Sequence, residues 1–257
     1  MNIYQHFRPE ERDFIDSVLQ WKDDVENTFA PKLTDFLDPR QQHIVKLIIG
    51  QGSEVQCQIF GGAEGTERKR ALLYTQYDQI EPADFKISLY EINYPSKFLK
   101  IEHSQVLGTL MSLGLKRGKF GDILVHHERA QFFATSEVGH YILTQLSSIG
   151  RAKVQIEEIS LDQALVTFEN WKEVSVTATS LRLDVILSTV YQISRAKSQA
   201  LIVAGLVKVN WTTIESSSFE CQESDLLSVR GLGRSKILSI EGKTKKDKWK
   251  VNVGKQN

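Results

Sequence analysis

The chain has 257 residues, of which 41% are hydrophobic and 25% charged, and its 32 basic side chains balance its 32 acidic ones. These values are ordinary for a soluble protein, and no apolar run approaches the roughly eighteen residues that a membrane span needs. Residues 1–8 also lack the apolar core of a signal peptide. We therefore expect a cytoplasmic protein of two or three domains, neither anchored in a membrane nor secreted.

Residues 1–80 are predicted to form a mixed α/β region. Pro9 is well placed near the start of a first helix. Apolar residues recur in this helix with its 3.6-residue period; they are Phe14, Ile15, Val18, Leu19 and Val25. Pro31 and Pro39 bracket an extended segment, and residues 41–49 form a second predicted helix that Gly50 and Gly52 end.

Two further strands, at residues 54–60 and 69–77, are predicted to form a hairpin around a Gly-rich loop. The loop lacks the Gly-Lys-Ser/Thr ending of a phosphate-binding loop and does not match G-x-G-x-x-G, so a hairpin loop is favoured over a nucleotide site. The cluster Arg68, Lys69 and Arg70 is a candidate secondary RNA contact, because clustered cations bind phosphates.

Residues 81–160 are predicted to form a ferredoxin-like domain. The predicted order is strand, helix, a hairpin of two strands, helix and strand, which RNA-recognition modules share with many other proteins. The segments are 85–92, 103–113, 122–127, 130–135, 136–149 and 153–159. An RNA-recognition module stacks bases on sheet aromatics, for which Tyr90, Phe132 and Phe133 are candidates. An aromatic residue on a strand more often belongs to the core, so a core placement is favoured for these residues.

The sequence predicts no metal, cofactor or disulfide. Cys57 and Cys221 are far apart and lack the spacing of metal ligands, so reduced thiols are expected in the cytoplasm. His126 and His127 are adjacent in a predicted hairpin, where their imidazoles would face opposite sides of the strand and could not share a metal ion.

Beyond a connector predicted at residues 161–180, which contains Phe168 and Trp171, the charge changes sign. Residues 180–257 hold 13 Lys and Arg against 7 Asp and Glu, a net of +6, whereas the rest of the chain holds 19 against 25, a net of −6. This separation indicates a basic interaction module. Within it, the Lys-rich residues 243–250 are either a solvated tail or a further nucleic-acid contact through Lys245, Lys246 and Lys248 around Trp249.

Two short helices are predicted after residue 180. Ser180 is the predicted N-cap of the first, and Asp184 lies near its positive end. One face of this helix is apolar at Leu183, Ile186, Leu187 and Val190. Ser194 caps the second helix and Gly205 ends it. The residues that it is predicted to bury are Ala196, Ala200, Val203 and Ala204.

A half-buried strand follows at residues 207–210, where two valines alternate with Lys208 and Asn210. We expect the two helices and this strand to gather Arg182, Arg195, Lys197 and Lys208 into one cationic ledge. Such a ledge suits phosphate oxygens, because Arg and Lys donate charge-assisted hydrogen bonds to them.

The register of these residues resembles the S4 RNA-binding domain. The matching positions are Arg182-Leu183-Asp184, Leu187, Ser194-Arg195, Lys197, Leu201-Ile202, Gly205, Val207, Val209-Asn210, Ser228-Val229-Arg230-Gly231 and Gly233-Arg234. Trp211 stands where that family usually has Gly, and Glu223-Ser224 precede Asp225 where Gly is common. Both departures lie in predicted turns, away from the RNA-facing helices.

The full layout resembles the bacterial YlmH family, with Phe60-Gly61-Gly62 and Glu67-Arg68 in the N-terminal region, a plait-like middle domain and a C-terminal S4 domain at 180–257. This resemblance implies an α+β protein of the large ribosomal subunit that acts in ribosome-associated quality control. Its partners would be ribosomal RNA and peptidyl-tRNA, with no small-molecule substrate, and the free chain would be a monomer. RNA-binding residues beyond the ledge would be Asp184, Ser194, Gln199, Asn210, Arg230 and Arg234.

Two alternatives stay open. S4 domains also target RNA-modifying enzymes, but Arg182-Leu183-Asp184 lies inside the binding helix and not in a catalytic stretch, and no glycine-rich cofactor loop follows a strand. No Gly-x-Ser-x-Gly elbow is present either, so a non-enzymatic binding protein is predicted. The second alternative is an interaction factor linked to cell division, because the family's gene often neighbours cell-division genes.

Overall fold

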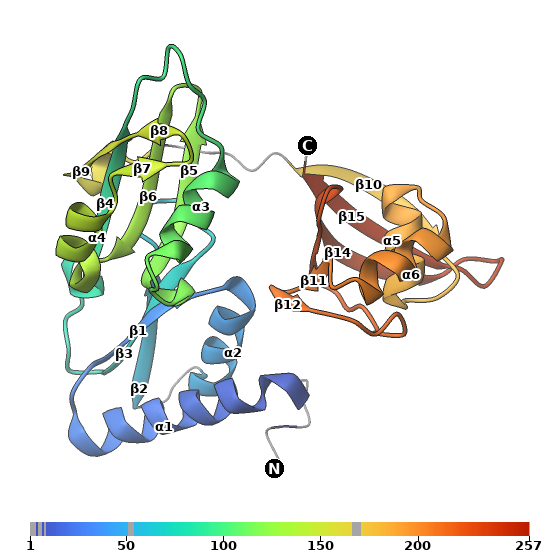
Figure 1. Cartoon of the computed structure of the whole chain (residues 1–257). Coiled ribbons are helices and arrows are strands. Elements are labelled where there is room, and N and C mark those ends of the chain that lie inside the picture. The colour runs from blue at the N-terminus through green and yellow to red at the C-terminus, as the bar shows by residue number, and fades with distance from the viewer. Residues whose placement is uncertain (1–3, 5–6, 8, 51–53, 166–170, 257) are drawn as a thin grey trace. The chain divides into compact units, whose positions relative to one another are not determined.

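The computed structural model describes residues 4, 7, 9–50, 54–165 and 171–256. The chain divides into two compact units, residues 1–167 and residues 168–257 (Figure 1). Both units combine helices with antiparallel sheets, so the predicted α+β class is confirmed. Cys57 and Cys221, both among the described residues, form no disulfide. No helix in the described part of the chain is long and apolar enough to cross a membrane.

The N-terminal region of the first unit comprises α1 (Arg12–Thr28), β1 (Lys32–Leu37), α2 (Pro39–Ile49), β2 (Val55–Phe60) and β3 (Lys69–Thr75). β3 is the central strand of an antiparallel sheet, and Ile15 and Val18 of α1 are buried in the core that α1 shares with it. α2 begins at Pro39, earlier than predicted, because Asp38 and Gln41 form a capping box and proline fits the first helical turn. Gly52, predicted to end this helix, lies outside the described residues.

The middle region comprises β4 (Ile87–Asn93), α3 (His103–Ser112), β5 (Phe120–His126), β6 (Arg129–Thr135), α4 (Gly139–Gln145) and β9 (Gln155–Ile159). Its sheet has the order β5-β6-β4-β9 with antiparallel neighbours, and the elements follow the split βαβ order. The helix predicted to run to residue 149 is wrong in extent. Gly150, at φ +57°, instead turns a small hairpin of β7 (Ser148–Ile149) and β8 (Ala152–Lys153).

Short 3₁₀ segments complete the first unit. They are η2 (Pro9–Glu11), η3 (Pro82–Phe85), η4 (Arg117–Lys119), η5 (Ser136–Val138) and η6 (Leu161–Gln163).

Both faces of the middle sheet are covered. Tyr90 and Phe132 stack with ring centroids 5.2 Å apart in the core formed with α3 and α4. Phe133 lies in a second core with Phe36 of β1 and Ala63 of the Gly-rich loop. All three candidate aromatics are 0% exposed. Their favoured placement in the core is confirmed and the stacking of bases on them is contradicted, because α3 and α4 cover one face of the sheet and the N-terminal region covers the other.

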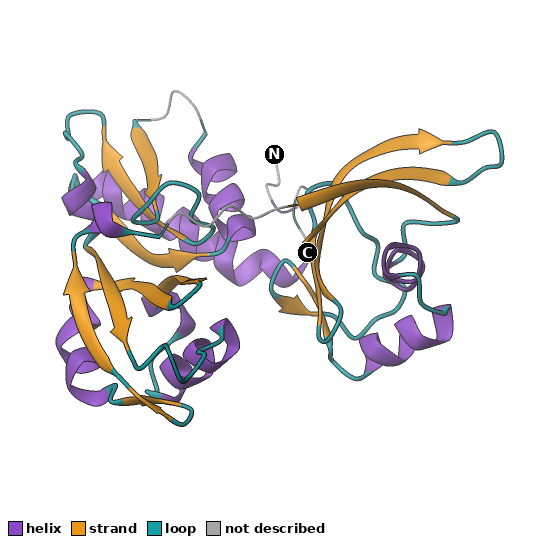
Figure 2. Cartoon of the chain, turned by 90° about the horizontal axis from the view of Figure 1, so that it is seen from above, coloured by secondary structure: helices purple, strands orange, loops and turns teal. Residues whose placement is uncertain are grey.

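The second unit comprises β10 (Trp171–Ala178), α5 (Leu183–Tyr191), α6 (Arg195–Val203), β11 (Val207–Val209), β12 (Thr212–Thr213), β13 (Leu226–Val229), β14 (Gly233–Lys243) and β15 (Trp249–Gln256). The strands form an antiparallel sheet in the order β10-β15-β14-β13-β11-β12, and both helices lie on one side of it (Figure 2). The predicted connector is wrong, since β10 pairs with β15 along its length. The predicted tail at residues 243–250 is also wrong, since it joins β14 to β15. Phe168 lies outside the described residues.

α6 buries a different face from the predicted one. Ser198 and Ile202, one helical turn apart, are fully buried, and Leu201 packs against the same core. The four residues predicted to be buried are all exposed; they are Ala196, Ala200, Val203 and Ala204. Leucine and isoleucine bury more apolar area than alanine, so the face of α6 that carries Leu201 and Ile202 packs against the core.

Candidate nucleic-acid interface

α5 begins at Leu183, and Arg182 occupies the N-cap position before it without a side-chain cap. The predicted cap, Ser180, is therefore wrong. The backbone fills this role, because the amide of Leu183 donates to the carbonyl oxygen of Phe219 at 2.8 Å. The first turn of α5 is thus satisfied by a neighbouring loop, and the N-cap position can carry a long cationic side chain.

Asp184, one residue into α5, is fully buried and accepts hydrogen bonds from three side chains. Arg182 Nε lies 3.1 Å from Oδ1, and Arg195 Nε and Gln199 Nε2 lie 2.9 and 2.8 Å from Oδ2. Burial by itself raises the pKa of this carboxyl, but the hydrogen bonds from Arg182, Gln199 and Arg195 outweigh it and hold the pKa at about 2. Asp184 therefore stays ionised and fixes the guanidinium groups of α5 and α6; we call these four residues the arginine cluster.

Arg182 and Arg195 face solvent, although Asp184, which holds them, is buried. The side chains of Arg182 and Arg195 are 39% and 56% exposed, against 0% for Asp184. Among the described residues, Arg195 donates only its Nε to protein, which leaves its terminal nitrogens for a ligand. Lys197 is exposed one turn into α6, and its amide donates to Ser194 Oγ at 3.2 Å, which confirms the predicted cap. These groups together present fixed and mobile cations on one pair of helices.

Lys208 does not join the arginine cluster. Val207 and Val209 pack into the core shared with α5 and α6, so the residue between them leaves the sheet on the opposite face. There Lys208 is in register with Ser228 of β13, which is in register with Arg234 of β14. The prediction of one ledge is wrong in this respect. The unit has two cationic surfaces, the helix surface with the arginine cluster and Lys197, and a sheet row made of Lys208, Ser228 and Arg234.

Ser228 was absent from the predicted RNA-binding set. The signal that could have identified it is the alternation of β13, in which Leu227 and Val229 enter the core and Ser228 faces outward. A match to a family pattern does not show which face of a strand a residue occupies.

Asn210, predicted to bind RNA, is a buried part of a turn. Its Nδ2 donates to Asp225 Oδ1 at 2.7 Å, and its Oδ1 accepts from the amide of Leu226 at 2.9 Å. Asn210 and Trp211 both have positive φ, at 48° and 67°, as the turn between β11 and β12 requires. Trp211 therefore takes a backbone conformation that favours glycine, and its ring centroid lies 5.9 Å from the guanidinium carbon of Arg234.

The remaining predicted cations lie on turns and strand ends. Arg230 is exposed in the turn between β13 and β14, and its amide donates to the carbonyl of Leu206 at 3.0 Å, close to the end of α6. Lys69 is half-buried at the start of β3. The exposed tip of the β14–β15 hairpin carries Lys245, Lys246 and Lys248. Their contact with RNA stays a prediction.

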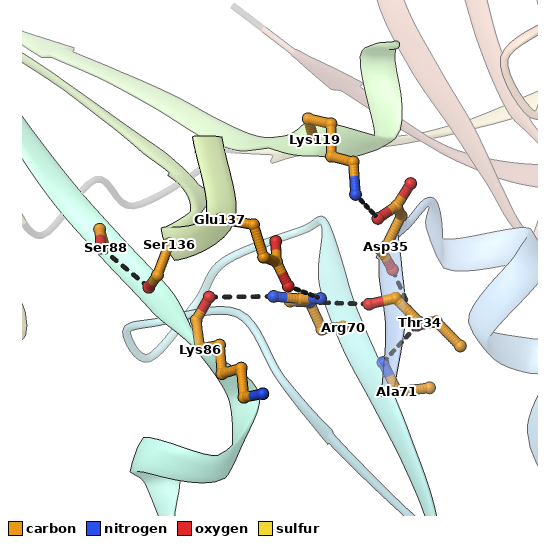
Figure 3. Close-up of polar contacts among 9 residues, drawn as sticks. All are labelled: Thr34, Asp35, Arg70, Ala71, Lys86, Ser88, Lys119, Ser136 and Glu137. Carbon is orange, nitrogen blue, oxygen red and sulfur yellow. Dashed lines mark hydrogen bonds and ion pairs between the residues drawn. The ribbon is translucent and has the colours of Figure 1, made fainter. Parts of the chain in front are cut away.

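Arg68 and Arg70 in the first unit are buried, at 8% and 2% exposure, which contradicts their predicted contact with RNA. Arg70 donates to the carbonyls of Thr34 and Lys86 at 2.7 and 2.9 Å and to the carboxylate of Glu137 at 3.1 Å (Figure 3). Arg68 donates to a backbone carbonyl of β1 at 2.8 Å. Arg70 thus fastens the N-terminal sheet to the middle region, and Arg68 is used within the fold.

His126 and His127 lie closer together than predicted, with ring centroids 4.1 Å apart. The prediction that they face opposite sides is wrong, because His127 has a positive φ of 53° and has left the strand. Within the part of the chain that the structure describes, no group of three His, Cys, Asp or Glu residues could hold a metal ion.

Three family models match the chain. One described as "YlmH, N-terminal" matches residues 10–77, one described as "Putative RNA-binding domain in YlmH" matches residues 81–163, and the S4 domain matches residues 181–227. The chain is 42% identical over 255 residues to a protein of Bacillus subtilis (strain 168) named ribosome-associated protein quality control protein P2. The matched region covers 99% of each chain. A solved structure named cell division protein ylmH, from Streptococcus pneumoniae, is similar with a TM-score of 0.56 and 38% identity, covering 64% of this chain and all of that one.

Proposed function

Because the chain belongs to the YlmH family, we propose that it is a non-enzymatic RNA-binding protein of the cytoplasm that acts on the large ribosomal subunit. There it would hold ribosomal RNA and peptidyl-tRNA in ribosome-associated quality control. The name of the Bacillus subtilis relative supports the ribosomal role, and the matched S4 domain supports RNA as the ligand. The observation that carries the proposal is the arginine cluster, in which a buried carboxylate holds two exposed guanidinium groups.

The geometry of the cluster suits an RNA backbone. Each guanidinium is planar and can donate two parallel hydrogen bonds to a phosphate. Since Asp184 already fixes Arg182 and Arg195, binding immobilises fewer side-chain rotamers than it would with free arginines. Lys197 adds a mobile point charge beside them. Structured RNA is recognised mostly through phosphates and 2′-hydroxyls, so the surface would select shape more than sequence.

The sheet row gives the same unit a second cationic surface. Lys208 and Arg234 lie on the face of the sheet opposite the helices. Two surfaces on opposite sides of one small unit allow two RNA segments to bind at once. This supports the proposal that the unit bridges ribosomal RNA and a bound tRNA.

The test is co-sedimentation of the full chain with large ribosomal subunits over a range of salt concentrations. The double variant Arg195→Gln with Lys197→Glu should lose association at physiological salt, and the slope of log K against log salt should fall by about 1 to 2. Lys46→Glu is the control, because Lys46 is an exposed lysine of α2 in the other unit. Unchanged sedimentation of the double variant would remove the helix surface from the proposal.

The alternative, an RNA-modifying enzyme, predicts that RNA incubated with the protein acquires a modified base. Incubation of the chain with bulk RNA, followed by nucleoside mass spectrometry, should show no modified base if the protein only binds. A protein-interaction factor would stay with its partners after nuclease treatment, whereas we expect nuclease to release this chain.

A further inference from the structure

The middle region cannot bind RNA with its sheet as an RNA-recognition module does. α3 and α4 cover one face of the sheet, and the Gly-rich loop is packed against the other. Gly62 of that loop, at φ +99°, lies so close to Phe133 that a Cβ at Gly62 would be 2.6 Å from its ring. Any RNA contact of this region must therefore lie outside the sheet faces.

Two loops come together at one end of the same sheet (Figure 1). The loop after β4 spans residues 94–102, and the turn between β5 and β6 carries His127 and Glu128. Ser96 Oγ donates to Glu128 Oε2 at 3.3 Å, which joins the two loops. We call Lys97, Phe98, Lys100, His126 and His127 the loop-end surface.

Phe98 is the most exposed aromatic residue of this surface, at 87%. It is held on a turn in which its own amide donates to the carbonyl of Pro95 at 3.0 Å, so the exposed ring is attached to ordered backbone. Exposure of so large an apolar ring is ordinary for a single residue. The neighbouring side chains make it informative here.

Cations lie on both sides of Phe98 in the sequence, and two imidazoles lie in or beside the turn that Ser96 joins to this loop. Lys97 and Lys100 flank it, and both are exposed without an ion-pair partner among the described residues. Of the acidic groups nearby, Glu91 is compensated by its ion pair with Arg129 at 2.7 Å, whereas Glu128 keeps its charge and accepts a hydrogen bond from Ser96. The paired rings of His126 and His127 add aromatic area and hydrogen-bond donors.

A flat ring between cations is the arrangement that binds single-stranded nucleic acid, because every base has a face that stacks on an aromatic ring and every nucleotide carries a phosphate. We propose that the middle region binds unpaired RNA with the loop-end surface, where a base stacks on Phe98 and the flanking phosphates contact Lys97 and Lys100. This inference rests on the proposed function only in taking RNA as the ligand. The sequence signal for this surface is the Lys-Phe-Leu-Lys stretch at residues 97–100.

The test uses a fluorescein-labelled dodecauridine and the full chain carrying Arg195→Gln and Lys197→Glu, so that the S4 domain contributes less to binding. In this background, Phe98→Ala should weaken binding about 5- to 150-fold, the range for loss of one stacked base. Phe98→Trp should retain binding. Tyr77→Ala is the control, since Tyr77 is 80% exposed in the N-terminal region.

A second measurement locates the contact directly. Ultraviolet crosslinking of the oligomer with 4-thiouridine should attach it to the peptide that contains Phe98. Equal binding by Phe98→Ala, an equal loss in Tyr77→Ala, or crosslinks confined to residues 180–257 would each overturn the inference. None of these outcomes affects the large-subunit sedimentation test, so the two proposals fail separately.

Discussion

In both units the described residues include a buried charged side chain that pairs with exposed partners of opposite charge, and the two arrangements are opposite. In the second unit the acid is buried: Asp184 has 0% side-chain exposure, while Arg182 and Arg195 have 39% and 56%. In the first unit the arginine is buried: Arg70 has 3% exposure and Glu137 has 46%. The chemistry of the ion pair is the same, but the group turned toward solvent is a cation in one unit and an anion in the other.

This difference distinguishes a surface that can bind a ligand from a contact that holds two regions of the fold together, which we call a fastening contact. A buried carboxylate leaves guanidinium donors facing outward, where a phosphate can meet them. A buried guanidinium uses its donors on the backbone carbonyls of Thr34 and Lys86, from two different regions of the unit (Figure 3). We therefore expect substitutions at Arg70 to change stability, and substitutions at Arg195 to change RNA affinity.

The largest effect is expected at Arg70. Arg70→Ala removes the hydrogen bond to the buried carbonyl oxygen of Thr34 and opens a cavity, whereas the carbonyl oxygen of Lys86 keeps its hydrogen bond from the amide of Ser136. The free energy of unfolding of the first unit should therefore fall by about 2–4 kcal/mol. The neighbouring exchange Lys69→Ala should change it by less than about 0.5 kcal/mol. Urea unfolding followed by circular dichroism measures both. A loss below about 1 kcal/mol for Arg70→Ala would contradict the fastening role.

Acid should weaken the contact of the second unit. The pKa of Asp184 is about 2 in the folded chain, below the value of about 3.9 expected after unfolding. Its stabilisation is therefore complete above about pH 5 and is lost as the pH falls toward 2, with a total of about 2 kcal/mol. The unfolding free energies of the wild type and of Asp184→Asn, compared at pH 5 and pH 2.5, isolate this contribution.

One outcome of this pH comparison would contradict the role of Asp184. If Asp184→Asn loses as much stability as the wild type between the two pH values, the carboxylate is not the buried anchor of the cluster. A carbon-13 NMR titration of the Asp184 carboxyl gives an independent value.

RNA affinity should respond to Arg195 by a smaller amount. Arg195→Gln removes a phosphate donor while Asp184 keeps its contacts with Arg182 and Gln199, so binding to large-subunit RNA should weaken by about 1–2 kcal/mol. Arg195→Lys keeps the charge but cannot both hold Asp184 and donate two parallel hydrogen bonds to a phosphate. Its RNA affinity should therefore lie between that of the wild type and that of Arg195→Gln. Arg40→Gln is the matched control, since Arg40 pairs with Glu11 in the first unit. Filter binding at fixed salt measures all three.

The sequence predicted best where a signal is local and repeated. The apolar face of α5 was predicted correctly, because Leu183, Ile186 and Leu187 recur with the helical period and are all buried. The ends of α6 were also correct, since Ser194 and Gly205 are specific to helix ends. In the resemblance to the S4 domain, these were the same positions that carried the family register.

Predictions failed where the outcome depends on partners far apart in sequence. β10 was taken as a connector because its partner strand β15 begins at residue 249. Arg70 resembles a surface cation until β1 and the middle region are placed around it. Lys208 matched the family pattern, yet only the sheet shows that its side chain faces away from the arginine cluster. Local pattern identifies an element more reliably than it identifies the surroundings of each side chain.

The smallest expected effect concerns Trp211, for which the resemblance to the S4 domain predicts a glycine. A non-glycine residue at φ +67° costs about 1–2 kcal/mol relative to glycine. Part of this cost is offset by the indole ring, which the guanidinium of Arg234 approaches at 5.9 Å and which contributes about 0.5–1 kcal/mol. Trp211→Gly should therefore raise the unfolding free energy of the second unit by less than about 1 kcal/mol, whereas Trp211→Val, which keeps the strain and loses the ring, should lower it. If both variants are destabilised equally in thermal unfolding, the ring contact outweighs the backbone strain, and the sheet row depends on Trp211 to position Arg234.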